Sequence, residues 1–334
     1  MKRNLSIILV ALALLMAPAA SYTQEPIVAG YIPVLPFSAL FVAQEKGYFK
    51  EQGLNVKLDP LPSGRDILVM VSAGEYQVGG GAVGSAAFNG FVRGLDFKVV
   101  GTLHGLDPKG PSVDPIMVRK KAVDAGEVKT IADLKGKKCA INAIGVATEY
   151  MLDRALRKGG LTLADIDLVT MPFPDMVPAL DRGAIVCGLL PEPLSTKAED
   201  AGIAVRFIPD YAPGMQVTVL YYNKKFMERR RVEAERFMVA YLKAIRDLQG
   251  DGWRSDENAA IINKYTKVPV PLIKKAVPPY WDPNGAINIE SIKDQQVFLM
   301  RRGHLAYKEL INVANMIDAS FIEKAVKTLG PFRR

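Results

Sequence analysis

Hydroxyl-bearing and small residues stand where the sequence predicts helices to begin, and such positions can hold a small ligand. Ser38, Ser85 and Thr148 each follow an apolar or glycine-rich stretch and precede or open a helical pattern. Helix starts present free backbone N–H groups and the positive end of the helix dipole, which attract the oxygen atoms of a ligand. Because Ser and Thr at such places are also common helix caps, the residues alone leave both roles open.

Glycines beside these positions would allow a ligand to approach the backbone closely. One run reads GGGAVGS over 79–85, and Gly145 follows a predicted strand over 138–143. The run is not a phosphate-binding loop, because no Lys-Ser/Thr pair follows its glycines, and the acidic partner of a dinucleotide-binding fold is missing at the expected distance. The pattern therefore favours another kind of small-ligand site.

Few residues are available for catalysis or for metal binding. The chain contains two histidines, His104 and His304, and two cysteines, Cys139 and Cys187, and neither cysteine has metal-ligand spacing. We predict no catalytic residue, no metal and no cofactor. We interpret the cysteines as two small buried apolar residues, and the sequence leaves a disulfide open, since an oxidising compartment would allow one if the geometry matched.

The order of predicted elements repeats once along the chain. Helix, Gly-Leu, strand, polar loop, helix, glycine turn and strand follow one another over 38–80 and again over 148–190. Such a repeat predicts two similar α/β lobes.

The second lobe is predicted to be inserted into the first. Apolar strands over 115–119 and 216–223 bracket it, which is the arrangement of a hinge, although two unrelated edge strands fit the periodicity equally well. After residue 223 the pattern is helical and predicts a helical layer on the first lobe. Lobe one would then comprise 25–114 and 223–334, and lobe two would comprise 115–222.

The first 20 residues have the pattern of a signal peptide. Lys2 and Arg3 precede an apolar stretch over 5–16 and a small-residue cleavage site near Ala19 and Ala20. The alternative, a retained membrane anchor, is disfavoured because spanning a bilayer takes roughly 20 apolar residues. We therefore predict an exported protein, which in a bacterium with two membranes is periplasmic.

The charge of the chain does not indicate a nucleic-acid partner. The formal net charge is +8, of which Lys2 and Arg3 contribute two. The densest basic run, over 229–231, lies among glutamates in a helical pattern and is interpreted as a solvated face. A nucleic-acid-binding protein would show a basic stripe with interleaved aromatic residues or a known motif, and neither is visible.

Four phrases resemble a known family. They are FVAQEKGYFKEQGLNVKL (41–58), SAGEYQVGG (72–80), ADLKGKKCAI (132–141) and DASFIEKAVKTLG (318–330). In this order they resemble the periplasmic solute-binding proteins of nitrate, sulfonate, taurine and thiamine-pyrimidine importers, over nearly the whole mature chain. The resemblance implies a type II two-lobe α/β fold with a doubly wound mixed sheet in each lobe. It also implies a monomer that closes on a small solute and delivers it to the transmembrane subunits of an ATP-driven importer.

On this interpretation the loops of both lobes face one cleft, because ligands of open α/β sheets lie beyond the carboxyl ends of the strands. Hydroxyls and backbone N–H groups would donate to ligand oxygens, and Phe37 would form an apolar wall. The expected ligand-binding residues are Pro36, Phe37, Ser38, Ser63, Gly84, Ser85, Gly145, Val146, Ala147 and Thr148.

Glu192 is a further candidate, since it follows the predicted strand over 184–190. A carboxylate there suits an amine or amidine-like donor and repels a simple anion. Glu192 would then favour a zwitterion or a nitrogen heterocycle over nitrate, and the resemblance to sulfonate-binding proteins adds a sulfonate to the expected ligands. The alternative is a solvated or salt-bridged surface glutamate.

Two other functions stay open at this point. One is an extracytoplasmic sensor that passes its ligand state to a membrane receptor. The other is an enzyme, since the eukaryotic pyrimidine-precursor synthases resemble the same fold. Their chemistry depends on an active-site histidine and clustered cysteines, whereas the two cysteines of this chain are 48 positions apart.

Overall fold

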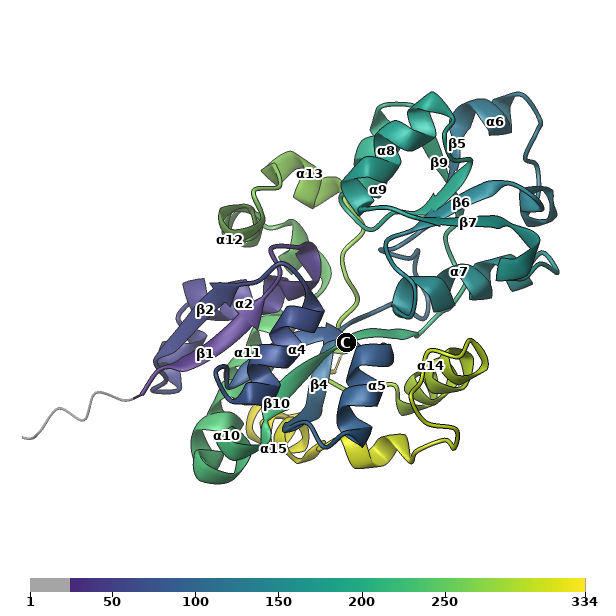
Figure 1. The fold of residues 1–334 in the computed structure, drawn as a ribbon. Coiled ribbons are helices and arrows are strands. Elements are labelled where there is room, and N and C mark those ends of the chain that lie inside the picture. Colours follow the sequence, from purple (N-terminus) through teal and green to yellow (C-terminus); the bar gives the residue numbers. More distant parts are fainter. Residues whose placement is uncertain (1–24, 334) are drawn as a thin grey trace, which may run out of the picture.

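The computed structural model describes residues 25–333 and contains two α/β lobes joined by extended segments (Figure 1). The predicted signal peptide lies outside the described residues. Within the described part of the chain, no helix combines the length and the apolar character needed to cross a membrane.

Lobe one is built on a mixed five-stranded sheet in the order β2-β1-β3-β10-β4. Strands β1, β2 and β3 are parallel, and β10 runs antiparallel between β3 and β4. The strands are β1 (Ile27–Tyr31), β2 (Val56–Pro60), β3 (Val78–Ala82), β4 (Phe97–Gly105) and β10 (Gln216–Asn223).

Lobe two repeats this arrangement in the order β7-β6-β8-β5-β9. Three parallel strands are again followed by an antiparallel one, here β5. The expectation of two similar lobes with mixed sheets is therefore confirmed. The strands are β5 (Ile116–Arg119), β6 (Lys138–Ile141), β7 (Asp167–Thr170), β8 (Cys187–Leu189) and β9 (Ala204–Ile208).

Helices cover both sheets. Those of the first half of lobe one are η2 (Leu35–Phe37), α2 (Ser38–Glu45), α3 (Tyr48–Glu51), α4 (Gly64–Ala73) and α5 (Ser85–Val92). Those of lobe two are α6 (Lys120–Asp124), η3 (Ile131–Leu134), α7 (Ala147–Arg157), η4 (Leu163–Asp165), α8 (Phe173–Arg182) and α9 (Leu194–Asp200).

The C-terminal part of the chain is helical, as predicted, and forms a layer on lobe one. Its longest helix, α11, packs against α2, α3 and α15, and its Phe237 meets the ring of Tyr222 from β10 edge to face. The elements are α10 (Lys224–Arg229), α11 (Arg231–Asp247), η5 (Gly250–Arg254), α12 (Asp256–Thr266), α13 (Val270–Lys275), α14 (Ile289–Arg301), η6 (Val313–Met316) and α15 (Ser320–Leu329).

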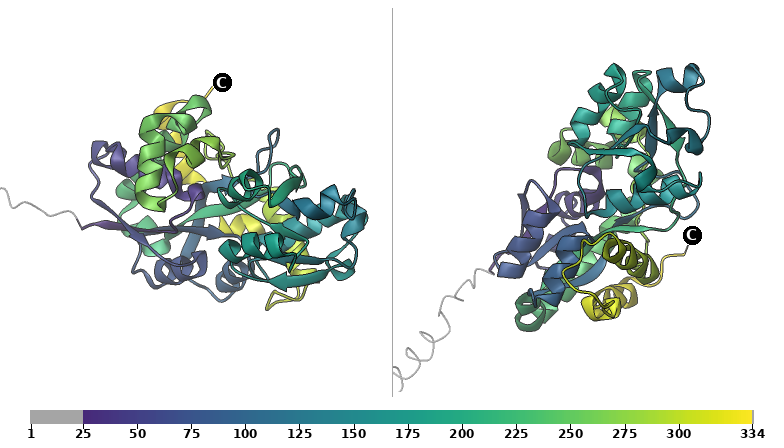
Figure 2. Two further views of the ribbon diagram at one scale, coloured as in Figure 1. Left: turned by 90° about the horizontal axis from the view of Figure 1, so that it is seen from above. Right: turned by 45° about the vertical axis from the view of Figure 1, so that its right-hand side comes forward.

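Two helices of this layer also reach lobe two. Figures 1 and 2 show the second lobe in teal, with α13 beside α9 and the yellow helix α14 beside α7, and contacts join both pairs. Lys275 at the end of α13 pairs with Asp200. The C-terminal layer therefore contacts both lobes, which the helical pattern alone did not predict.

The two strands expected to form the hinge lie inside the sheets instead. The first, β5, lies between β8 and β9, and the second, β10, lies between β3 and β4 in lobe one. A strand that is buried along almost its whole length, as β10 is, belongs at the centre of a covered sheet. The connecting segments are 106–115 and 209–215, where the Ser112 N–H donates to the Pro209 carbonyl at 2.8 Å.

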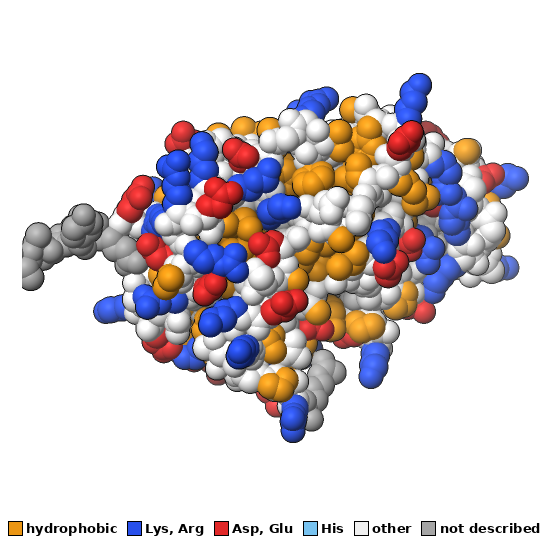
Figure 3. All heavy atoms as spheres, turned by 90° about the horizontal axis from the view of Figure 1, so that it is seen from below, with side chains coloured by type: hydrophobic (Ala, Val, Ile, Leu, Met, Phe, Trp, Pro, Cys, Tyr) orange, Lys and Arg blue, Asp and Glu red, His pale blue; other side chains and the backbone are white. Residues whose placement is uncertain are grey.

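Charged side chains are mixed over the surface shown in Figure 3, where Lys and Arg are interspersed with Asp and Glu. Many form ion pairs, such as Arg231 with Glu235 in the basic run over 229–231. This agrees with the interpretation of that run as a solvated helix face.

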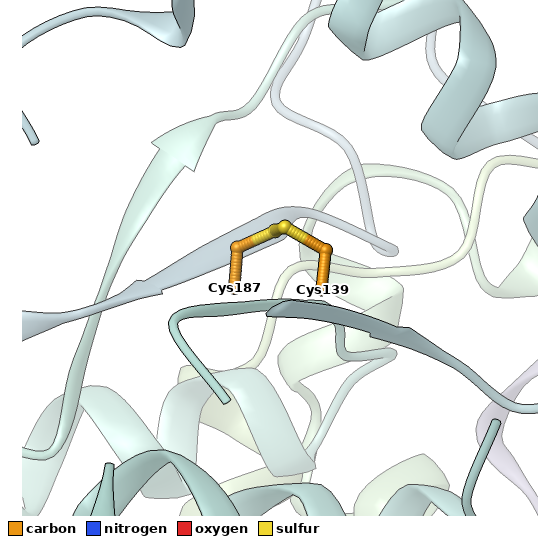
Figure 4. The surroundings of a disulfide bond; sticks show 2 residues. All are labelled: Cys139 and Cys187. Atoms are coloured by element: carbon orange, nitrogen blue, oxygen red, sulfur yellow. A yellow bond between two sulfur atoms is a disulfide. The ribbon is translucent and has the colours of Figure 1, made fainter. Parts of the chain in front are cut away.

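A disulfide joins Cys139 of β6 to Cys187 of β8 (Figure 4). The two residues are register partners in neighbouring parallel strands, with their Cα atoms 4.5 Å apart. Our interpretation of the cysteines as separate apolar residues was therefore wrong, because the strand register that pairs them cannot be read from the sequence. Both residues are fully buried in the core of lobe two.

The disulfide closes a loop with a sequence separation of 48 residues. Closing a loop of that length restricts the unfolded chain by roughly 4 kcal/mol in the loop-entropy model. We expect the Cys139→Ala/Cys187→Ala double variant to lose about that much of the free energy of unfolding, measured by denaturant titration. Mass spectrometry of the exported wild-type protein after alkylation should find no modified thiol, and a fully alkylated protein would contradict the disulfide.

Candidate functional site

The helix starts of α5 and α7 meet across the boundary between the lobes. The backbone N–H of Ser85, the first residue of α5, donates to the carbonyl of Gly145 in lobe two at 3.0 Å. A side chain at Gly84 would lie 3.0 Å from that carbonyl, and one at Gly145 would lie 2.9 Å from the Ser85 hydroxyl. The structure therefore brings Gly84 and Ser85 together with Gly145 and Val146, and the lack of a side chain at the two glycines permits this close approach.

The candidates that follow β1 lie deeper than expected. The ring of Phe37 is 2% exposed and packs over Gly80 of β3, where an added side chain would lie 3.2 Å from it. Ser38 is fully buried, and its hydroxyl donates to the carbonyl of Leu35 at 2.6 Å. Ser38 is not the N-cap that we expected, because the turn η2 precedes it and Phe37 takes the cap position of α2. Pro36 is half-buried.

Two further hydroxyls bond locally. Ser63 caps α4, since its hydroxyl accepts from the Asp66 N–H at 3.2 Å and donates to the Asp66 carboxylate. Thr148 lies inside the first turn of α7, whose N-cap is Val146, and its hydroxyl donates to Asn142 at 2.6 Å. For Ser63 the helix-cap alternative therefore describes the side chain. Ala147, the first residue of α7, is buried.

A buried carboxylate that the sequence analysis missed connects the lobes. Glu149 of α7 is fully buried and accepts from the Gly145 N–H at 2.7 Å, from Arg302 Nε at 2.9 Å and from His304 Nε2 at 2.9 Å. Arg302 and His304 follow α14. We call these three side chains the Glu149 cluster. Nothing in one sequence distinguishes this glutamate from any acidic residue in a first helical turn.

The Glu149 cluster is fixed to lobe one by α5. The side chain of Asn89 donates to the His304 carbonyl at 3.1 Å and accepts from the Ala306 N–H at 2.7 Å. Since Asn89 belongs to lobe one and Glu149 to lobe two, the cluster holds the starts of α5 and α7 near each other. Charge-assisted hydrogen bonds of this kind are stronger than neutral ones.

An apolar contact accompanies the cluster. The rings of Tyr150 on α7 and Phe298 on α14 meet edge to face with centroids 5.3 Å apart. Burial raises the pKa of Tyr150 above its ordinary value, so its hydroxyl keeps its proton. Helix α14 therefore packs along α7 with both polar and apolar contacts.

The carboxylate of Glu192 is not free. Glu192 is 4% exposed, and its oxygens accept from Arg206, from the Thr196 hydroxyl at 2.9 Å and from the Val277 N–H at 3.2 Å. The peptide bond between Glu192 and Pro193 is cis. Glu192 is therefore salt-bridged, as in the alternative, but buried rather than at the surface, because Arg206 of β9, which lies beyond β5 from β8, pairs with it. Through Val277 it also connects lobe two to the segment that follows α13.

Among the described residues, no group of three or more His, Cys, Asp or Glu side chains could hold a metal ion. The candidate residues instead bring backbone N–H groups, hydroxyls and apolar side chains to the carboxyl ends of strands. Such an arrangement can bind and orient a small polar molecule.

Known proteins share both the sequence pattern and the fold. A model of the NMT1/THI5-like family matches residues 36–251. A putative thiamine biosynthesis protein of Haemophilus influenzae is 25% identical over 226 residues, which are 65% of this chain and 68% of that protein.

Solved structures with this fold include both binding proteins and an enzyme. The aliphatic sulphonate binding protein SsuA of Escherichia coli has a TM-score of 0.73 at 17% identity, covering 89% of this chain and 92% of that one. The nitrate-binding protein NrtA of Synechocystis PCC 6803 has a TM-score of 0.68 at 16% identity, covering 91% of this chain and 89% of that one. The desulfurization enzyme DSZB has a TM-score of 0.65 at 15% identity, covering 92% of this chain and 100% of that one. At these identities the similarity establishes the fold, and the family model, which matches more than half of the chain, establishes that the protein belongs to the NMT1/THI5-like family.

Proposed function

We propose that the protein binds a small organic solute between its two lobes and delivers it to the transmembrane subunits of an ATP-driven importer. The observation that supports this most directly is the contact of Ser85 with Gly145, which places helix starts from both lobes at one point. The family, and the fold shared with SsuA and NrtA, agree with this role. We infer a zwitterion, a sulfonate or a nitrogen heterocycle as the solute from the family and its sulphonate-binding structural relative, and no longer from Glu192, whose carboxylate pairs with Arg206.

The proposal includes the location of the protein. The signal-peptide pattern of residues 1–20 and the periplasmic proteins among its structural relatives support export to the periplasm, where the chain would act as a monomer. The disulfide of lobe two fits an oxidising compartment.

Binding and closure must be linked for this function. A solute shifts the lobes towards a closed state only by as much as it binds that state better than the open one. Backbone N–H groups in the first turns of α5 and α7 other than that of Ser85, together with the Ser85 hydroxyl, would supply that difference, because they face one another only when the lobes meet. Val34 and Ile144, which follow β1 and β6, are 40% and 45% exposed and would add apolar contact.

The test is a solute library measured by calorimetry and X-ray scattering, with native mass spectrometry of protein purified without denaturation. We expect at least one solute of the proposed classes to give heat and to reduce the radius of gyration. A library that produces neither would contradict the proposal. Incubation with the bound solute followed by mass analysis separates binding from catalysis, and uptake assays in a strain lacking the protein separate an importer from a sensor.

Gly145→Ala tests whether the contact between the lobes matters for binding. Gly145 and Gly160 both have positive φ, 75° and 73°, so alanine strains the backbone at either position by roughly 1–2 kcal/mol. Only at Gly145 does the added carbon meet the other lobe, 2.9 Å from the Ser85 hydroxyl, whereas nothing lies within 4 Å of it at Gly160. We expect both variants to lose similar stability and Gly145→Ala alone to lose solute affinity, measured by calorimetry. Equal affinities would show that the lobes do not close here.

Glu149→Gln tests the Glu149 cluster. The substitution keeps the shape but removes the charge that Arg302 and His304 share, and we expect a loss of about 2 kcal/mol in the closed state, or roughly 30-fold in solute affinity. Glu290→Gln is the control, because Glu290 pairs with Lys293 on the exposed face of α14 and is 79% exposed. If both variants bind the solute as the wild type does, the cluster has no part in closure.

A further inference from the structure

One point in the middle of the lobe-one sheet keeps contact with solvent. Strand β10 is buried at every residue except Thr218, and β3 at every residue except Ala82. The two residues are register partners at the carboxyl end of β3. Because helices cover the faces of this sheet, the exposure of two residues in its central strands comes from its carboxyl edge, which is the floor of the proposed binding cleft.

Behind Thr218 lies a buried imidazole and carboxylate. Nδ1 of His104 is 2.6 Å from the Thr218 hydroxyl oxygen, and Nε2 of the same ring is 3.3 Å from a carboxylate oxygen of Asp114. The side chains of His104 and Asp114 are 4% and 10% exposed. The three residues come from β4, from the connecting segment 106–115 and from β10, so they meet where lobe one joins the hinge.

This arrangement is held in place from several sides. The Tyr211 hydroxyl donates to the Asp114 carbonyl at 2.7 Å, and the Ser112 hydroxyl accepts from the Asp114 N–H at 3.0 Å. Burial, followed by the charge of Asp114, raises the pKa of Tyr211 well above its ordinary value, which keeps that donor protonated. Gln216 donates to the carbonyls of both His104 and Thr218. Groups fixed in this way can bind a ligand selectively without rearranging.

The positions of the hydrogen atoms follow from the donors and acceptors present. An ionised carboxylate only accepts, so Asp114 takes the hydrogen on Nε2 of His104, and in a neutral ring that is the only N–H hydrogen. Nδ1 then has a lone pair and accepts the hydroxyl hydrogen of Thr218. The Thr218 hydroxyl therefore donates its one hydrogen to His104, and its oxygen can only accept a hydrogen bond from a group in the proposed cleft.

We propose that Thr218 is a specificity-determining residue that accepts a hydrogen bond from an N–H or O–H group of the solute, with His104 and Asp114 as positioning residues. The proposal rests on the proposed function and adds to it the chemistry required at one point of the ligand. A solute that places an amino group over Thr218 gains a bond there. A solute that places a sulfonate or nitrate oxygen there is disfavoured, because two oxygen acceptors with no hydrogen between them repel each other.

The test uses two pairs of probes that differ by one amino group, taurine against ethanesulfonate and 4-aminopyrimidine against pyrimidine. We expect the wild type to prefer the amino member of at least one pair. Thr218→Val, which keeps the shape and removes the acceptor, should reduce that preference about tenfold, and Thr218→Ser should retain it. An unchanged preference in Thr218→Val contradicts the proposal, as does failure of both pairs to bind, whereas binding of any other library solute would still support the proposed function.

Ring ¹⁵N spectroscopy of the full chain gives a second readout. The chain has two histidines, so His304→Asn assigns the signals of His104. We expect a neutral ring with its hydrogen on Nε2 and an Nδ1 shift that moves in Thr218→Val but not in Thr148→Val. In a charged ring, or in one with its hydrogen on Nδ1, the ring would donate to the Thr218 oxygen. The Thr218 hydroxyl would then be free to donate to the solute, which would overturn the proposal.

Discussion

The structure depends on a buried carboxylate that receives hydrogen bonds from both sides of the boundary between the lobes. Removing a charge from water costs several kcal/mol unless partners replace the water. Besides the Gly145 N–H of its own lobe, Glu149 has Arg302 and His304 as partners, and only while these two lie against α7. When the lobes separate, water can replace those partners. The interaction is therefore specific to one relative position of the lobes, and the same position aligns the starts of α5 and α7.

Such a contact must not be too strong if a solute is to control closure. A ligand can shift only an equilibrium that lies within its own differential binding energy. The partners of Glu149 fit this requirement, because the side chains of Arg302 and His304 are 38% and 20% exposed and so retain part of their hydration. The single backbone bond between Ser85 and Gly145 is similarly modest. Two permanent connections, the segments 106–115 and 209–215, keep the lobes together when these contacts open.

Local patterns predicted the elements well and their partners less well. Apolar runs and glycine turns located the repeated strands and helices of both lobes. The glycines at 84 and 145 predicted a close approach of a ligand, whereas the close approach that the structure shows is between the two lobes. Strand order, in contrast, depends on residues far apart in the sequence. For that reason β10 was assigned to the hinge, and the register that pairs Cys139 with Cys187 was missed. The ion pairs of Glu192 and Glu149 could not be predicted for the same reason, because their partners lie elsewhere in the sequence, on β9 and in the segment after α14.

The order Asp114, His104, Thr218 also resembles the carboxylate, imidazole and hydroxyl of a hydrolase triad, and the fold includes a desulfurization enzyme. Nucleophilic catalysis needs, besides the triad, donors aimed at the oxygen that becomes negative. The donors beside Thr218 are committed elsewhere: the Tyr221 hydroxyl donates to the Ala82 carbonyl at 2.8 Å, and the Gln216 amide donates to Thr102 and to two backbone carbonyls. Burial raises the pKa of Tyr221, which keeps that bond in place. These neighbours therefore hold the backbone around Thr218 in place, and the hydrogens named here are not aimed at the Thr218 oxygen.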